Sequence, residues 1–289
     1  MKWARARSPR LPRGIVLAVA LSLGIGQAGA RANSPSIVVT YDVEYDGLLS
    51  LDVGRATVQY SATGAGYQLS LSFRPSSSAH SFAVGPAAAR TSGLISTRGL
   101  SPASATLDYS IRSLSETRNF TFAGDRLQSV HIAKKKSGGL FKDGSAVAYD
   151  PRALPAYAPL SDADQKGVLD PLSAMFLPVS GKDGLDRANC ERKLRIYDGR
   201  RRFDLVMTYR GTEKTALNGE ALVCSASYVP IAGHSLEGDD FTTKMRDYRI
   251  AVALVAAPGS NFLIPARITL TDAGGDSVAE AKAIALSGR

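Results

Sequence analysis

The sequence predicts an all-β protein, built as an antiparallel barrel-like or strongly curved sheet of about 10–13 strands with one short helix. Three observations predict this fold class. Apolar and polar residues alternate with a period of two, turn signals separate the alternating runs, and the runs follow one another at short spacing. A strand with one buried and one solvated face is typical of antiparallel sheets.

The alternation is clearest in three segments. In residues 37–45 isoleucine, valine and tyrosine alternate with threonine and acidic residues, and in residues 67–73 tyrosine, leucine and phenylalanine alternate with glutamine, serine and arginine. In residues 203–209 apolar side chains alternate with Asp204 and Thr208. Each segment predicts a strand that turns one face toward the core.

Glycine-containing turns separate the predicted strands. They lie at residues 46–47, 63–66, 124–125, 143–144, 198–199 and 273–276. The clearest hairpin joins residues 192–197 to residues 202–209 through Asp198-Gly199.

A segment rich in Pro, Ala and Asp, at about residues 150–180, interrupts the strands and divides them into an N-terminal group (36–149) and a C-terminal group (190–287). Asp170 can cap a helix and Pro171 suits the first helical position. Apolar side chains at positions 172, 175 and 176 would share one face, so we expect a short amphipathic helix over residues 171–177, ended by Pro178. We expect this helix to cover an edge of the core; the alternative is a lid over a ligand.

The last predicted strand has alanine at positions 279, 281, 283 and 285, all on one face. A face of small residues allows another layer to approach closely. Pairing with the first strand to close a barrel would use it.

Residues 1–30 have the three parts of a secretory signal peptide. A basic segment precedes an apolar run at residues 15–25, and Ala28-Gly29-Ala30 supplies the small residues of a cleavage site. We expect cleavage after Ala30, or after Ala32 at the overlapping site. The apolar run is shorter than the approximately 20 residues that span a bilayer, and no later stretch is long enough. These features predict an exported protein that works outside the reducing cytosol and has no transmembrane segment, and whose mature chain (33–289) is a single domain.

The net charge of +9 overstates the basic character of the mature chain, because five basic residues lie in the signal and leave a charge near +4. This charge argues against a nucleic-acid partner. Two local basic runs remain, lysines 134–136 and arginines 200–202, and both are predicted to lie in solvated turns.

Cys190 and Cys224 are the only cysteines. In a secreted protein such a pair predicts a disulfide, with two free thiols or half of a metal site as alternatives. The disulfide would close a loop of about 35 residues and contribute roughly 3–4 kcal/mol. The three histidines are scattered without ligand spacing, so neither a metal nor another cofactor is expected.

Two segments carry a resemblance to a known family. Residues 169–175 (LDPLSAM) and 197–205 (YDGRRRFDL) resemble a bacterial envelope family, domain-of-unknown-function family 3108 (DUF3108). The segment between the cysteines, residues 228–234 and Pro265-Ala266-Arg267 are similar to its alphaproteobacterial branch. The resemblance implies a predominantly β, barrel-like fold and export in a Gram-negative bacterium. It implies no activity and no catalytic residues.

A search for catalytic chemistry finds no nucleophile elbow, no zinc-protease motif and no P-loop. His80 lies in a serine-rich loop and His131 in a predicted strand. His234 is the strongest candidate because Gly233 precedes it and Glu237 lies close by, but a structural hydrogen bond is the favoured interpretation. The acidic pairs 162/164 and 239/240 lack the ligand count of a calcium loop and are predicted to be solvated turns.

These observations favour a non-enzymatic periplasmic protein that binds an amphipathic ligand, such as a lipid, or an envelope protein partner. His234, Arg192 and Arg200 are the candidate ligand contacts. The arginines around the predicted hairpin could hold an acidic group, although protection of a strand edge by charge is the commoner explanation. The alternatives are a structural or assembly factor of the envelope and, third, a hydrolase acting on cell-wall or lipid material.

Overall fold

The computed structural model describes residues 36–79, 84–111, 114–136, 146–148, 158–217, 219–235 and 240–287. The chain divides into two compact units, residues 1–32 and 33–289, and every element described below belongs to the second unit. The predicted signal with both cleavage sites, His80, the turn at residues 143–144, Glu237 and Asp239 lie outside the described residues.

The described residues include fifteen strands, one α-helix and short 3-10 turns, of which the two that lie near the cleft or the cysteines are named here. The first nine strands are β1 (Ser36–Asp46), β2 (Ser50–Thr63), β3 (Gly66–Pro75), β4 (Val84–Ser96), β5 (Gly99–Ile111), β6 (Leu114–Ala123), β7 (Arg126–Lys136), β8 (Ala146–Ala148) and β9 (Leu177–Pro178). The last six are β10 (Lys193–Tyr197), β11 (Arg202–Lys214), β12 (Glu220–Ala232), β13 (Arg249–Ala256), β14 (Phe262–Thr271) and β15 (Asp276–Ser287). The 3-10 turns are Ser173–Met175 and Arg187–Asn189, and the helix α1 is Asp240–Asp247.

All of these strands belong to one antiparallel sheet, which confirms the all-β prediction. Its order is β10-β11-β12-β13-β14-β15-β1-β2-β3-β4-β5-β6-β7-β8, with β9 paired to β14. The alanine-rich strand β15 does pair with β1, as its small side chains suggested. Among the described strands, however, the path ends at β10 and at β8, so the sheet is strongly curved and open rather than a closed barrel.

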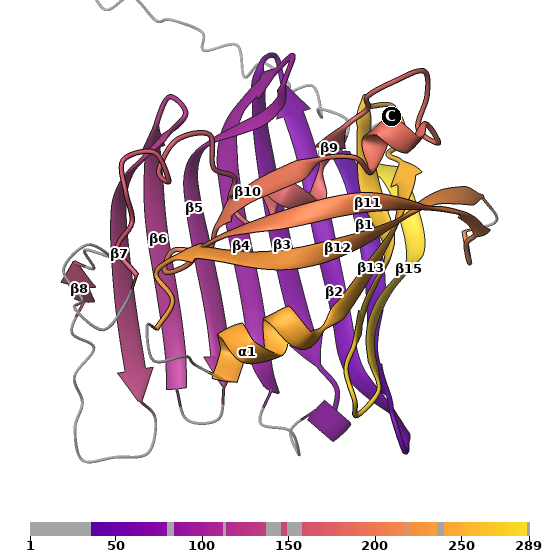
Figure 1. The fold of residues 1–289 in the computed structure, drawn as a ribbon, viewed down its shortest axis with the longest axis horizontal. Helices are drawn as coiled ribbons and strands as arrows, with labels where there is room; N and C mark the ends of the chain where they lie inside the picture. Colours follow the sequence, from indigo (N-terminus) through magenta and orange to yellow (C-terminus); the bar gives the residue numbers. More distant parts are fainter. Residues whose placement is uncertain are drawn as a thin grey trace, which may run out of the picture. The chain divides into compact units, whose positions relative to one another are not determined.

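Figure 1 shows how the curved sheet forms two layers. Strands β1–β7 lie side by side, β10–β12 cross over them, and β13–β15 connect the two sets. Aromatic side chains fill the space between the layers: the rings of Tyr60 and Phe176 stack at 5.1 Å, and Phe120 meets Tyr197 edge to face at 5.8 Å. The interior is therefore a packed core.

The small side chain of Ala281 has a specific packing role where β15 meets β1. Ala281 lies opposite Tyr41 in the register of the two strands and is 1 % exposed. The Tyr41 hydroxyl donates a 2.8 Å hydrogen bond to the carbonyl oxygen of Pro265 on β14, the strand on the far side of β15. A larger residue at 281 would compete with the tyrosine ring for this space.

The hairpin predicted around Asp198-Gly199 is confirmed as β10 and β11. The amide of Asp198 donates to the carbonyl of Arg201 at 3.1 Å, and the Asp198 carboxylate accepts from the amides of Arg200 and Arg201 at 2.8 and 2.6 Å. Gly199 has φ +84°, which favours glycine. The aspartate and glycine of this motif thus build the turn.

The predicted helix over residues 171–177 is wrong, because only Ser173–Met175 form a 3-10 turn. Asp170 does cap this turn by accepting from the amides of Leu172 and Ser173, both at 3.0 Å. The chain then becomes extended at Phe176 and pairs with β14 through Leu177–Pro178. A proline disfavours helical geometry in the residue before it, and this pairing ends the turn early.

Cys190 and Cys224 lie at disulfide distance, with Cα atoms 5.4 Å apart. Both are fully buried. The link joins the turn before β10 to the centre of β12, so it fixes the start of β10 against its own sheet.

Candidate ligand-binding cleft

A cleft of about 320 Å³ lies between the edge of β10 and the segments that face it, which are the β4–β5 turn, the β6–β7 turn and residues 167–178. Its floor is apolar and includes Leu100, Phe122, Val168, Leu169, Phe176 and Leu177. Its rim is basic and includes Arg98, Arg192, Lys193 and Arg195, with Asp125 as the acidic lining residue. An apolar floor with a few convergent charges is typical of a ligand site.

The guanidinium of Arg192 is fixed at this rim by neutral oxygens. It donates to the carbonyl of Pro178 at 3.0 Å and to Ser180 Oγ and Asn189 Oδ1, both at 3.1 Å. Burial lowers the pKa of Arg192. None of its hydrogen-bond partners among the described residues is a carboxylate, so the charge of Arg192 is held in place without being neutralised.

The wall opposite β10 is anchored by the buried carboxylate of Asp170. Besides capping the 3-10 turn, Asp170 Oδ1 accepts a 2.7 Å hydrogen bond from Thr91 on β4. Burial raises the pKa of Asp170, although these hydrogen bonds oppose the rise. Next to it, Leu169 makes a parallel bridge to Ile196 of β10. Of the family-like motif at residues 169–175, Leu169 thus lines the cleft, and Asp170 anchors the turn that follows.

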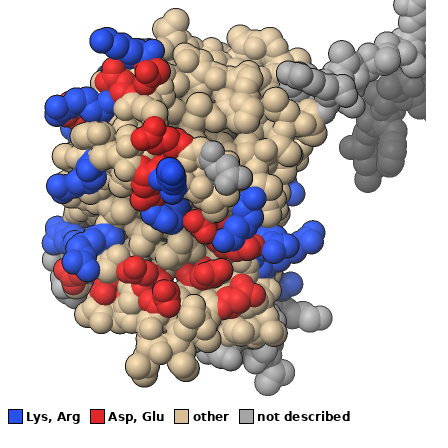
Figure 2. All heavy atoms as spheres, turned by 90° about the vertical axis from the view of Figure 1, so that its right-hand side faces the viewer, with Lys and Arg blue, Asp and Glu red and all other residues tan. Residues whose placement is uncertain are grey.

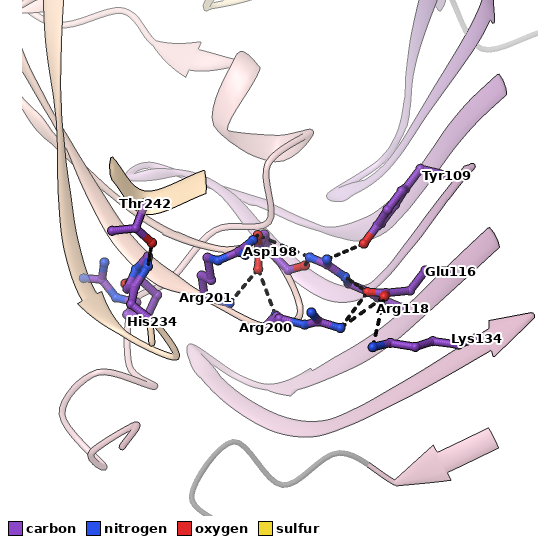
Figure 3. A network of polar contacts seen from close by, with 10 residues as sticks. Tyr109, Glu116, Arg118, Lys134, Asp198, Arg200, Arg201, His234 and Thr242 are labelled. Carbon is purple, nitrogen blue, oxygen red and sulfur yellow. Dashed lines mark hydrogen bonds and ion pairs between the residues drawn. The ribbon is translucent and has the colours of Figure 1, made fainter. Parts of the chain in front are cut away.

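The β10–β11 turn is clamped to strands β6 and β7 by a cluster of ion pairs, shown in Figure 3. Glu116, with 2 % of its side chain exposed, lies 2.6 Å from Arg118, 3.1 Å from Arg200 and 3.7 Å from Lys134. Arg118 also reaches Asp198, with 3.2 Å between Nη1 and the carboxylate. Hence the turn that carries β10 is attached to the opposite layer at residues 80 or more positions away in sequence.

The charges in this clamp stabilise one another. Burial alone would raise the pKa of Glu116, but the hydrogen bond and charge of Arg118 and the charge of Arg200 hold it below its ordinary value. Burial also opposes the charge of Arg118, yet the neighbouring Asp198, Tyr109 and Glu116 raise its pKa. Both side chains are therefore charged at neutral pH.

The arginines at 200–202 are not in a solvated turn, which corrects the sequence-based expectation. Their side chains are 21 %, 15 % and 2 % exposed. Arg200 binds Glu116, Arg201 lies 3.7 Å from Asp198, and Arg202 pairs with Asp204 at 2.6 Å. The lysines at 134–136 are also not in a turn, because they form the end of strand β7. Lys134 keeps 52 % of its side chain exposed while it reaches Glu116.

His234 is buried and serves as a structural tie. Its Nδ1 lies 2.9 Å from Thr242 Oγ1 on α1, and its Nε2 lies 3.2 Å from the carbonyl oxygen of Arg202 on β11. The imidazole therefore joins the helix to the sheet, away from the cleft lining. His131 lies on β7 opposite Asn119 and is exposed.

Of the three candidate contacts named from the sequence, only Arg192 lines the cleft. Arg200 instead binds Glu116 in the ion-pair cluster, and His234 contacts Thr242 on α1. Sequence reasoning missed Glu116 and Arg118. Both lie on the same buried face of β6 as Phe120 and Phe122, because the four residues alternate along the strand. Charged residues at positions where the alternation predicts a buried side chain are the signal that could have found them.

Asp162 and Asp164 have local partners in the structure. Asp162 pairs with Arg126 at 2.7 Å, and Asp164 accepts from the hydroxyl of Ser161. Within the described ranges, no group of three or more His, Cys, Asp or Glu is placed to hold a metal ion. The helix in the described part of the chain is too short and polar to cross a membrane.

Two other surfaces contrast with the cleft. A shallow hollow of about 470 Å³ on the outer face of β2–β5 is lined mainly by serine, threonine and glutamine side chains, so it lacks an apolar floor. The side of the molecule formed by β1 and β13–β15 carries acidic and basic side chains close together, as Figure 2 shows. Several of them form ion pairs, such as Arg55 with Asp42 and Lys282 with Glu280. This side therefore has mixed charge, whereas the rim of the cleft is mainly basic.

The model of a family described as "Protein of unknown function (DUF3108)" matches residues 40–281, which include all of the residues that line the cleft. No curated protein and no solved structure shows a significant match.

Proposed function

The chain belongs to the DUF3108 family, and from that premise we propose that it is an exported, non-enzymatic binding protein of the bacterial envelope. The ligand of this proposal is amphipathic, with an apolar part and an acidic group. The single observation that carries the proposal is the cleft beside β10, where an apolar floor lies under a rim of four cationic residues and one acidic residue.

Because the interior is packed, the proposed site lies at the surface. Tyr60, Phe176 and Phe262 pack against one another where a hollow sheet would hold its ligand. Phe176 also lines the cleft, so the floor of the site is the outer boundary of the core. A ligand would cover this boundary without entering the sheet.

The positions of the two described histidines, His131 and His234, support binding over hydrolysis. A hydrolase that uses a serine nucleophile needs a histidine between that serine and a carboxylate. Both ring nitrogens of His234 instead face the Thr242 hydroxyl and a backbone carbonyl. His131 lies on an exposed strand face, outside the cleft lining.

The binding proposal is tested by calorimetry with three twelve-carbon probes, dodecanoate, dodecanol and dodecylamine. Dodecanoate should bind most tightly, because it alone combines the apolar chain with an anionic group. Arg98→Gln and Arg192→Gln should each weaken dodecanoate binding by about tenfold, the effect of one lost charge-assisted hydrogen bond. Arg98 is the cleaner site, because its side chain is exposed and Arg192 also holds Pro178.

Arg55→Gln is the matched control. Arg55 pairs with Asp42 at 2.9 Å on the other side of the molecule, and its loss should leave binding unchanged. Equal affinity for dodecanoate and dodecanol, or an equal loss in the control, would overturn the proposed site.

Export is tested by the mass of the protein in a periplasmic extract. Cleavage after Ala30 or Ala32 would give a chain that begins at Arg31 or Asn33. Full-length protein that stays in the cytoplasmic fraction would refute export and leave the cleft to be tested alone.

A further inference from the structure

We propose that the cleft receives its ligand as an extended, acidic peptide segment that adds as a strand to the open edge of β10. This inference rests on the proposed function of the cleft and names the class of its ligand. It starts from the position of β10, which is a terminal strand of the sheet and lines the cleft. Strand addition at such an edge is an established mode of peptide recognition.

The hydrogen bonds of the β10–β11 hairpin show which backbone groups of β10 face the cleft. The amide of Met207 donates to the carbonyl of Arg192 at 2.9 Å, and the amide of Asp198 donates to the carbonyl of Arg201. In an antiparallel pair, alternate residues direct both backbone groups to the partner strand. Even-numbered residues of β10 therefore bond to β11, and odd-numbered residues direct their backbone groups to the opposite edge.

Leu169 occupies only part of this edge. Its carbonyl accepts from the amide of Tyr197 at 2.9 Å, and its amide donates to the carbonyl of Arg195 at 2.8 Å. The chain then leaves the edge at Gly167, whose φ is +61° and whose amide donates to Asp125 instead. The amide of Arg195 and both backbone groups of Lys193 have no hydrogen-bond partner among the described residues.

These open groups favour a peptide over a simple acyl chain as the natural ligand. A hydrocarbon that filled the cleft would remove water from the backbone of Lys193 and Arg195 without replacing its hydrogen bonds, which is unfavourable. An extended peptide would bond to them, and its alternate side chains would reach the apolar floor. The cationic rim selects acidic residues in that peptide.

A short edge strand with basic residues also occurs where a sheet is protected from pairing. The experiment must therefore separate recognition from protection. The probe is a fluorescent hexapeptide of sequence Glu-Val-Thr-Leu-Glu-Val with both termini blocked, and its binding to the mature protein is measured by fluorescence anisotropy. Three peptides serve for comparison. Two carry N-methyl groups on alternate residues, one on the odd-numbered and the other on the even-numbered positions, and the third has lysine in place of glutamate.

Lys193→Pro removes the amide that faces the cleft and keeps every bond to β11, since proline is tolerated where its missing N–H would face outward. Lys193→Ala is its matched control, because alanine removes the same charge and keeps the amide. We expect Lys193→Pro to bind the peptide about three- to tenfold more weakly than Lys193→Ala, as for the loss of one hydrogen bond. The lysine peptide should not bind. Of the two N-methylated peptides, the one whose methyl groups replace the N–H groups that face β10 should not bind either.

Three results would overturn the inference. If dodecanoate binds with the expected dependence on Arg98 while the peptide does not bind, the ligand is a lipid-like anion and the proposed function stands without strand addition. If both N-methylated peptides bind as well as the parent, recognition does not use the backbone of β10, and this result holds even where the proline variant fails to fold. If neither dodecanoate nor the peptide binds, the edge is only protected and both proposals fail.

Discussion

Replacing Glu116 by glutamine tests the clamp that attaches the β10–β11 turn to strands β6 and β7. The carboxylate has 2 % of its side chain exposed and lies within 3.7 Å of three cationic groups. Removing one partner of a buried ion pair costs about 3–5 kcal/mol, because the other charge stays buried and uncompensated. Arg118 keeps Asp198 as a partner, so we expect the lower end, a loss of about 3 kcal/mol in the free energy of unfolding.

The assay is equilibrium unfolding in urea at pH 7, monitored by circular dichroism and by tyrosine fluorescence. Glu44→Gln is the matched control, because Glu44 is exposed and lies opposite Asp52 in the register of β1 and β2. Its replacement should change stability by less than about 0.5 kcal/mol. A loss below about 1 kcal/mol for Glu116→Gln would refute the argument that these charges are desolvated and coupled.

The pH dependence of the same variant provides a second check. The pKa of Glu116 is lower in the folded protein than its ordinary value, so the folded state favours the ionised form. The resulting stability is present above the unfolded-state pKa of about 4.3 and is lost as pH falls through the lower folded value. The difference in the free energy of unfolding between wild type and Glu116→Gln should therefore be constant from pH 6 to 8 and decrease in acid. The slope of this decrease should correspond to the titration of about one group.

Three further substitutions have defined outcomes. Replacing Cys190 and Cys224 together by alanine should lower the free energy of unfolding by about 3–4 kcal/mol, since the pair is separated by 34 positions, and the loss is read from denaturant titration. Gly199→Ala should destabilise the protein by about 1–3 kcal/mol more than Gly124→Ala. Both glycines have positive φ, but a Cβ at position 199 would lie 3.0 Å from the side chain of Arg118, whereas a Cβ at position 124 would meet open space. Ala281→Leu should lower the free energy of unfolding by about 1–3 kcal/mol, because the larger side chain would crowd the ring of Tyr41; the loss is measured as a lower thermal midpoint.

Each of these predictions has a result that contradicts it. Equal stability of wild type and the double cysteine variant under oxidising conditions would show that the cross-link is absent or without effect. Equal losses at the two glycines would show that the arginine moves aside without cost. For Ala281 the control is Ala285→Leu on the exposed end of the same strand, and an equal effect there would refute the packing argument.

The strands could be predicted from the sequence because their signals are local. The alternation in residues 37–45, 67–73 and 203–209 became β1, β3 and β11, and glycine turns marked the ends of several strands correctly. Period two and turn chemistry depend on neighbouring residues alone. The helix at 171–177 failed because a distant pairing, between Leu177–Pro178 and β14, overrode the local apolar pattern.

The cleft could not be predicted because it depends on contacts between distant segments. Its walls come from residues near 100, 123, 168, 177 and 194, which only the complete fold brings together. Arg192 was named from its place beside the hairpin, without knowledge of Pro178 or of the apolar floor. Glu116 and Arg200 are 84 positions apart, and no local pattern shows that they would meet.

The position of β15 has a consequence for how the protein acquires its structure. This strand comes after the fourteen others in the sequence, yet it lies between β14 and β1, where it joins the two halves of the sheet. The backbone pairing of the sheet is therefore not continuous from β10 to β8 until residues 276–287 have been synthesised, and the pairs that β15 makes with β1 and β14 are among the last that the growing chain can form.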